Sequence, residues 1–131
     1  MTRIIVFCVL VTAGLAAIKK VAPGPRTSAR DVFASSCASC HGADGKGGGP
    51  AAAALKIAPP DLTTLTIRNN GNFPYARVSS TISGDATRTE FVNREMPCFG
   101  LIFRGTPNQD AATAQARVAA LTEYIRTLQA K

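Results

Sequence analysis

The sequence feature that most constrains this chain is a run of five residues, Cys37-Ala38-Ser39-Cys40-His41. The spacing C-x-x-C-H is the attachment motif of c-type haem. In such a motif the two thiols add to the vinyl groups of the porphyrin, and the histidine that follows becomes a ligand of the iron. The motif therefore predicts that Cys37 and Cys40 hold one haem c covalently, with His41 as an axial ligand.

Other chemistries use the same residue types. A C-x-x-C pair can be a redox dithiol, but the thioredoxin-like form needs a βαβ context, and no strand pattern precedes Cys37. A zinc site would have to add the distant Cys98 to the motif, whereas zinc ligands usually come as two separated pairs. The remaining alternative is a disulfide, or two structural thiols beside a chance histidine. We favour haem attachment.

Composition limits the class of protein. The 131 residues fit one domain, and a hydrophobic content of 46% argues against disorder. Trp is absent and aromatic residues are only 6%, so a porphyrin would supply the large apolar body that the side chains lack. The formal charge is +7, but the basic residues are scattered, so no nucleic-acid partner is expected. The charge fits either a mildly basic solvated surface or docking of acidic redox partner proteins.

The first twenty residues are expected to be a signal peptide or a membrane anchor. Arg3 precedes an uncharged, mostly apolar run over residues 4–18, which is long for a cleaved signal core and short for a membrane span. Small residues near its end favour cleavage, whereas Lys19 and Lys20 would flank a retained tether in the inner membrane. Either outcome places the domain in the periplasm, soluble or anchored to the periplasmic face of the inner membrane.

The remainder predicts an all-α domain over residues 28–131, after a Pro- and Gly-containing linker over residues 21–27. Ser28 and Asp31 have capping-box form. Helices are expected at about 28–37, 61–65, 74–83 and 110–129, with a helical turn over 51–56 and a loop over 85–94. In the last helix Ala114, Val118, Leu121, Ile125 and Leu128 recur at three- and four-residue steps, which is typical of an amphipathic helix.

The second axial ligand follows from counting candidates. His41 is the only histidine, and Met96 is the only methionine apart from the first residue. Pro97 after it favours a non-helical ligand loop. We therefore expect Met96 to bind the iron, where a neutral thioether favours the ferrous state. Without this bond the site would be open to small ligands, and the function would shift toward a haem sensor or a peroxidase-like enzyme.

A wider pattern supports this interpretation. The chain resembles bacterial class I cytochromes c in the order of four segments: residues 37–42, Gly49-Pro50, residues 96–100 and a final helix ending at 120–128. The resemblance covers the chain from about Ser28 to its end. It implies the class I cytochrome c fold, in which the first and last helices cross around one covalently bound haem with an exposed edge.

The resemblance also assigns roles to single residues. It implies that Pro50 supplies a carbonyl to the ring N–H of His41, and it makes Arg94 a candidate partner of a haem propionate, a solvated arginine being the alternative. Cys98 departs from the pattern, since such proteins often carry a non-thiol residue there. We expect an inert buried thiol, an intermolecular disulfide or a substitute iron ligand being the alternatives.

These features predict single-electron transfer, as a carrier or as the cytochrome subunit of a larger oxidoreductase. No acid–base pair or nucleophile constellation stands out in the sequence, so no enzyme activity of the chain itself is expected. Asp44, Asp61 and Asp85 fall in turns and are expected to act as turn or cap residues.

Overall fold

The computed structural model describes residues 27–85, 95–105 and 110–131. The predicted signal or anchor, nearly all of the linker and Arg94 lie outside these residues. In chain order the elements are α1 (Ala29–Ser36), α2 (Ala38–His41), η1 (Ala52–Ala54), η2 (Leu62–Thr64), α3 (Leu65–Arg68), α4 (Tyr75–Ser83), α6 (Phe99–Arg104) and α7 (Ala111–Thr127), where η marks a 3₁₀ helix. None of the described residues is in a strand. The all-α prediction is confirmed.

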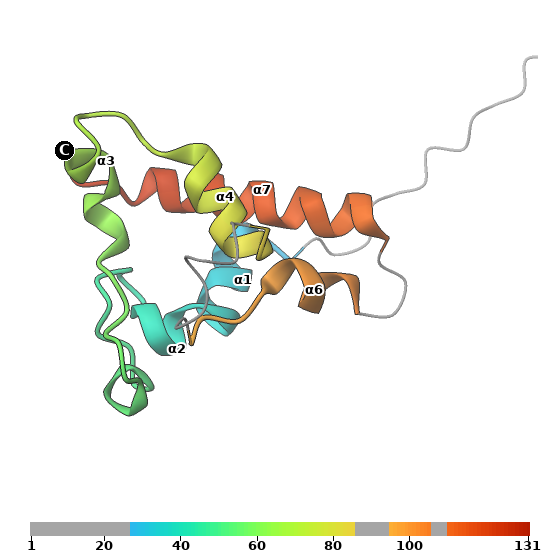
Figure 1. Cartoon of the computed structure of the whole chain (residues 1–131), viewed down its shortest axis with the longest axis horizontal. Coiled ribbons are helices and arrows are strands. Elements are labelled where there is room, and N and C mark those ends of the chain that lie inside the picture. Colours follow the sequence, from blue (N-terminus) through green and yellow to red (C-terminus); the bar gives the residue numbers. More distant parts are fainter. Residues whose placement is uncertain (1–26, 86–94, 106–109) are drawn as a thin grey trace, which may run out of the picture.

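Helix α7 is the element on which the others pack. It contacts α1, α4 and α6, and it runs along the whole width of the domain in Figure 1. Asp110 caps its first turn by accepting a hydrogen bond from the backbone N–H of Thr113 at 2.7 Å. The predicted stripe is buried over Ala114, Val118, Leu121 and Ile125, whereas Leu128 is half-buried.

Helix α1 begins with the predicted capping box. The backbone N–H of Asp31 donates to Ser28 Oγ at 3.1 Å, and the N–H of Ser28 donates to the Asp31 carboxylate at 3.2 Å. The helix buries Val32 and Phe33. The rings of Phe33 and Tyr124 lie 5.3 Å apart, which is within the range of a favourable aromatic pair. The first and last helices therefore pack together, as the resemblance implied.

Helices α4 and α6 cover the remaining side of α7, and α6 was not among the expected helices. α4 ends at Gly84, a left-handed C-cap with φ of 84°. Gly100 of α6 approaches α4 so closely that a Cβ there would collide with the carbonyl oxygen of Ser83. This close approach buries Phe99 and Phe103 and leaves Leu101 and Ile102 exposed.

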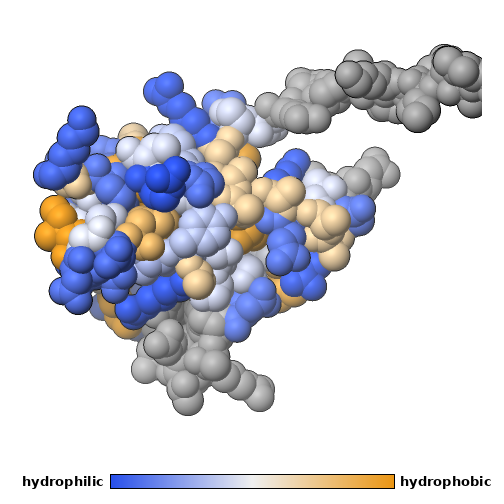
Figure 2. Space-filling view, turned by 90° about the horizontal axis from the view of Figure 1, so that it is seen from above, coloured by the Kyte–Doolittle hydropathy of each residue, from blue (hydrophilic) through white to orange (hydrophobic). Residues whose placement is uncertain are grey.

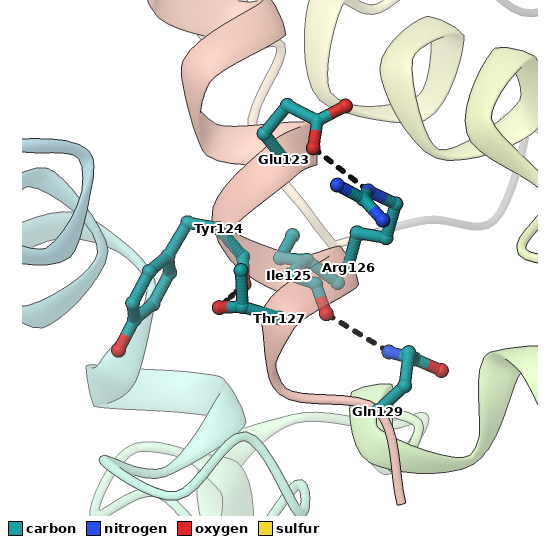
Figure 3. A network of polar contacts seen from close by, with 6 residues as sticks. All are labelled: Glu123, Tyr124, Ile125, Arg126, Thr127 and Gln129. Atoms are coloured by element: carbon teal, nitrogen blue, oxygen red, sulfur yellow. Dashed lines mark hydrogen bonds and ion pairs between the residues drawn. The ribbon is translucent and has the colours of Figure 1, made fainter.

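Hydrogen bonds of the Gln129 side chain connect the end of α7 to η2 and α3. Gln129 Nε2 donates to the carbonyls of Leu62 at 2.7 Å and Ile125 at 2.9 Å, and its Oε1 accepts from the N–H of Thr66 at 2.9 Å. Figure 3 shows the contact between Gln129 and Ile125. These contacts place η2 and α3 beside the last turn of α7.

The exterior of the domain is mixed in polarity. Figure 2 shows hydrophilic residues over much of the face seen from above, with hydrophobic residues in separate groups among them. Within the described ranges, no helix combines the length and the apolar character needed to cross a bilayer.

Candidate functional site

A cavity of about 590 Å³ lies between the helices and two loops, a size within the usual range of about 300–1,000 Å³ for small-molecule sites. Its lining is predominantly apolar and includes part of the domain core: Phe33, Val78, Ile82, Phe99, Leu121 and Ile125. The core is therefore arranged around a space that its own side chains do not fill.

The C-x-x-C-H motif lies on the wall of this cavity. Cys37 ends α1, and Cys40 and His41 belong to the single turn of α2 that follows. The N–H of His41 donates to the carbonyl of Cys37 at 2.9 Å, so one helical turn holds the three side chains in place. All three line the cavity.

No disulfide joins the two motif cysteines in the structure. Burial raises the pKa of Cys37 to about 11, and the neighbouring Cys40 adds to the effect. Catalytic dithiols instead need a lowered thiol pKa, because the thiolate is the nucleophile. The raised pKa of Cys37 therefore argues against the redox-dithiol alternative.

The zinc alternative receives no support either. In the described part of the chain, no three His, Cys, Asp or Glu side chains lie close enough together to hold a metal ion. Cys98, which that alternative requires, is not among the residues that line the cavity.

His41 is buried, with 9% of its surface exposed. Its Nδ1 atom lies 3.4 Å from the carbonyl oxygen of Pro60. Burial lowers the pKa of His41, and the Pro60 carbonyl opposes this effect. The neutral imidazole is thus favoured, which is the form that binds a metal. Because a carbonyl oxygen only accepts, Nδ1 carries the proton toward Pro60, and Nε2 is the ring nitrogen available to a metal.

The carbonyl on the His41 ring is that of Pro60 and not, as the resemblance implied, that of Pro50. Pro50 is exposed, and its two neighbours bind the motif backbone instead. The N–H of Gly49 donates to the carbonyl of Cys40 at 3.1 Å, and the N–H of Ala51 donates to the carbonyl of Ser39 at 2.8 Å. Asp61 follows Pro60 and caps η2 by accepting from the Thr63 N–H at 2.8 Å. No sequence pattern marks the contact between Pro60 and His41.

Met96 lines the same cavity from another segment, the loop that leads into α6. It is half-buried and packs against the core. Cys98, two residues later, is half-buried beside Gly84 and does not line the cavity. The cavity therefore brings together the predicted residues Cys37, Cys40, His41 and Met96, and it leaves out the competing thiol.

Two arginines on the cavity wall were missed by the sequence reasoning. Arg68 of α3 and Arg77 of α4 both line it, and Arg68 also donates to the backbone carbonyl of Asp61 at 2.5 Å. Arg77 could have been found from helical spacing, because Val78 and Thr81 lie on the same side of α4 and also line the cavity. Guanidinium groups there suit carboxylates of a bound molecule. Arg94, the predicted candidate, lies outside the described residues.

Comparison with known families agrees with the geometry. The family model described as Cytochrome c matches residues 27–129. The chain belongs to the cytochrome c family. Proteins of this family carry covalently bound haem c and transfer electrons through it, so this cytochrome is a haem c protein. Comparisons with curated proteins and with solved structures gave no match.

The residues present fit that cofactor. Two thiols three positions apart, a buried imidazole and a thioether line one apolar cavity, which is the donor set of a His- and Met-ligated haem c. Membership of the cytochrome c family also explains the cavity in the core. The largest apolar group of the domain is the haem and not an amino-acid side chain.

Proposed function

We propose that this cytochrome transfers single electrons through one haem c attached to Cys37 and Cys40, with His41 and Met96 as the axial ligands. The observation that carries the proposal is the position of Met96. It comes from the loop before α6, far from the motif in sequence, yet it lines the cavity that the motif also lines.

The chain's own residues have distinct tasks in this function. Bound haem supplies the one-electron chemistry of its iron. Cys37 and Cys40 fix its position, and Pro60 orients the His41 ring and strengthens its donation. A neutral thioether from Met96 favours the ferrous state. The apolar lining keeps water away, and the packed helices limit how far the ligands move between oxidation states.

We propose a periplasmic role, either as a carrier or as the cytochrome subunit of a larger oxidoreductase. The apolar run over residues 4–18 supports export, with cleavage or a retained tether as the two outcomes. The charge of +7 supports docking of acidic redox partners. N-terminal sequencing of the exported protein distinguishes cleavage from a tether. A rate of electron transfer that does not depend on ionic strength would rule out electrostatic docking.

The central test is optical. The purified holoprotein is expected to show the weak far-red absorption band of Met-ligated ferric haem, and the variant Met96→Ala is expected to lose it. The matched control is Cys98→Ala, which removes the nearby sulfur that does not line the cavity and should retain the band. A wild-type protein without the band that binds carbon monoxide readily would instead indicate an open iron site, as in a sensor or peroxidase.

A further inference from the structure

Glu95 forms a bridge between two loops of the cavity wall. Its carboxylate accepts hydrogen bonds from the backbone N–H of Lys56 at 2.7 Å and from that of Ile57 at 3.3 Å. These partners lie in the loop between η1 and η2, whereas Glu95 immediately precedes Met96. The two segments are 38 and 39 residues apart in sequence at these contacts. The bridge is therefore a tertiary contact and not a turn of local origin.

Both bridged segments line the cavity. On one side Leu55 and Ile57 through Pro60 contribute to the wall, and on the other side Glu95, Met96 and Pro97 do. Pro60 is also the residue whose carbonyl meets the His41 ring. Glu95 thus links the segment that carries Met96 to the segment that orients His41.

The Met96 loop, residues 95–98, is attached differently at its other end. Cys98 packs against Gly84 so closely that a Cβ at position 84 would lie 2.7 Å from the Cys98 Cβ. Gly100 is packed against the Ser83 carbonyl two residues later. Met96 is therefore held between backbone packing on one side and the Glu95 hydrogen bonds on the other.

We propose that Glu95 is a positioning residue that keeps the Met96 loop closed over the cavity. The proposal rests on the proposed function, in which Met96 is an axial ligand. An ionised acceptor makes stronger hydrogen bonds than a neutral one, and opening the loop far enough to withdraw Met96 requires that the two bonds to the facing loop break. Glu95 therefore lowers the population of the open state, in which another ligand can reach the iron.

The test is a titration of the ferric holoprotein with imidazole, followed through the loss of the far-red band. Because imidazole competes with Met96, its apparent affinity scales with the open fraction. Glu95→Ala is expected to raise that affinity by about tenfold, which is the scale of losing hydrogen bonds to a charged acceptor. Glu95→Gln keeps an acceptor oxygen at the same reach and should stay within about threefold of the wild type. A Gln variant as permissive as the Ala variant would overturn the hydrogen-bonding role.

The matched control is Glu123→Ala. It also removes an exposed glutamate, but from α7, where it pairs with Arg126 and does not line the cavity. Imidazole affinity should be unchanged in this variant. If Glu95→Ala lowers thermal stability and leaves imidazole affinity at the wild-type value, Glu95 is only structural and the proposal fails.

A third variant at this position keeps the proposal testable if Glu95→Ala binds haem poorly. Glu95→Asp retains the charge but is shorter by one methylene, so its carboxylate cannot reach the facing loop as well. A raised imidazole affinity of this variant supports the bridge, and an affinity equal to that of the wild type overturns the bridge. Failure of the proposed function is seen separately, because a wild-type protein without the far-red band has no Met ligand to displace. A wild-type protein with the band and no response in any Glu95 variant overturns the bridge alone.

Discussion

The Nδ1 atom of His41 lies 3.4 Å from the carbonyl oxygen of Pro60. This carbonyl is held in place by the loops around it. Asp61, the next residue, caps η2, and the N–H of Leu62 donates to the carbonyl of Gly45 at 2.8 Å. Gly47 approaches Pro59 so closely that any side chain there would strike its carbonyl. The glycine-rich loop over residues 42–49, which follows the motif, therefore brings the Pro60 carbonyl to the ring.

Replacing Pro60 with glycine should raise the reduction potential. Pro→Gly frees the backbone at this position, so the carbonyl no longer stays on the ring and the imidazole donates less electron density to the iron. Weaker donation destabilises the ferric state, and we expect an increase on the order of tens of millivolts, measured by redox titration. Pro50→Gly is the matched control. If it shifted the potential as much as Pro60→Gly, the orienting role of Pro60 would be refuted.

The contact between Gly84 and Cys98 leads to a second prediction. Gly84 has φ of 84°, which strains any other residue, and an added Cβ would also meet the Cys98 side chain. Gly84→Ala should therefore lower the free energy of unfolding by about 1–3 kcal/mol, measured by denaturant unfolding of the holoprotein.

Two other glycines separate the causes of this loss. Gly71 has φ of 81° but nothing near its missing Cβ, so Gly71→Ala should show the backbone strain alone. At Gly48 a Cβ would meet nothing within 4 Å, and φ is not in the left-handed region, so Gly48→Ala should be close to neutral. If Gly84→Ala is as stable as Gly71→Ala, the Cys98 side chain moves away from the added Cβ at little cost in free energy.

The features that the sequence predicted are those with a local signal. The motif chemistry depends on five consecutive residues, the capping box on Ser28 and Asp31, and the buried stripe of α7 on steps of three and four. Each can be recognised without knowing what lies across the fold. The capping box and the buried stripe appear in the structure at the expected residues, except that Leu128 is half-buried, and the three motif side chains line one cavity.

The features that were missed depend on contacts between distant segments. Helix α6 is six residues long, and its consecutive apolar residues show no period, so only packing against α4 and α7 decides which of them are buried. The resemblance pointed to Pro50, and only the path of the glycine-rich loop, with positive φ at Gly42, Gly45 and Gly47, shows that Pro60 reaches the ring instead. The Glu95 bridge spans almost forty residues and leaves no pattern in the sequence.

Gln129 allows a third prediction, because one side chain joins three backbone groups. Its amide contacts Thr66, Leu62 and Ile125, and it is half-buried. Gln129→Ala leaves these groups without their partner and should reduce the free energy of unfolding by about 1–3 kcal/mol. Thermal unfolding of the holoprotein would measure the loss.

The control for Gln129 lies in the same turn. Arg126 pairs with Glu123 at 2.7 Å (Figure 3), but both side chains are at least half exposed. Exposed ion pairs of this kind are worth at most about 1 kcal/mol. Arg126→Ala should therefore reduce the free energy of unfolding clearly less than Gln129→Ala does. Equal reductions would mean that the hydrogen bonds from Gln129 to η2 and α3 contribute little to stability.

The cap of α7 gives the fourth prediction, a dependence of stability on pH. The backbone N–H of Thr113 donates to the Asp110 carboxylate and lowers the pKa of that carboxyl below its ordinary value, with help from the Thr113 side chain. A carboxyl whose pKa is lower in the folded than in the unfolded chain stabilises the fold fully above the unfolded value of about 3.9. That stabilisation is lost as the pH falls through the lower, folded-state pKa.

Asp110→Asn isolates this effect, since asparagine caps a helix about as well but does not titrate in this range. Between about pH 5 and pH 3 the wild type should lose more stability than the Asn variant, because only its cap becomes protonated. Urea unfolding at a series of pH values gives the difference between the two proteins. Other carboxylates titrate in both and cancel in that difference. A difference that stays constant across the range would mean that the Asp110 carboxyl has the same pKa in the folded and the unfolded chain.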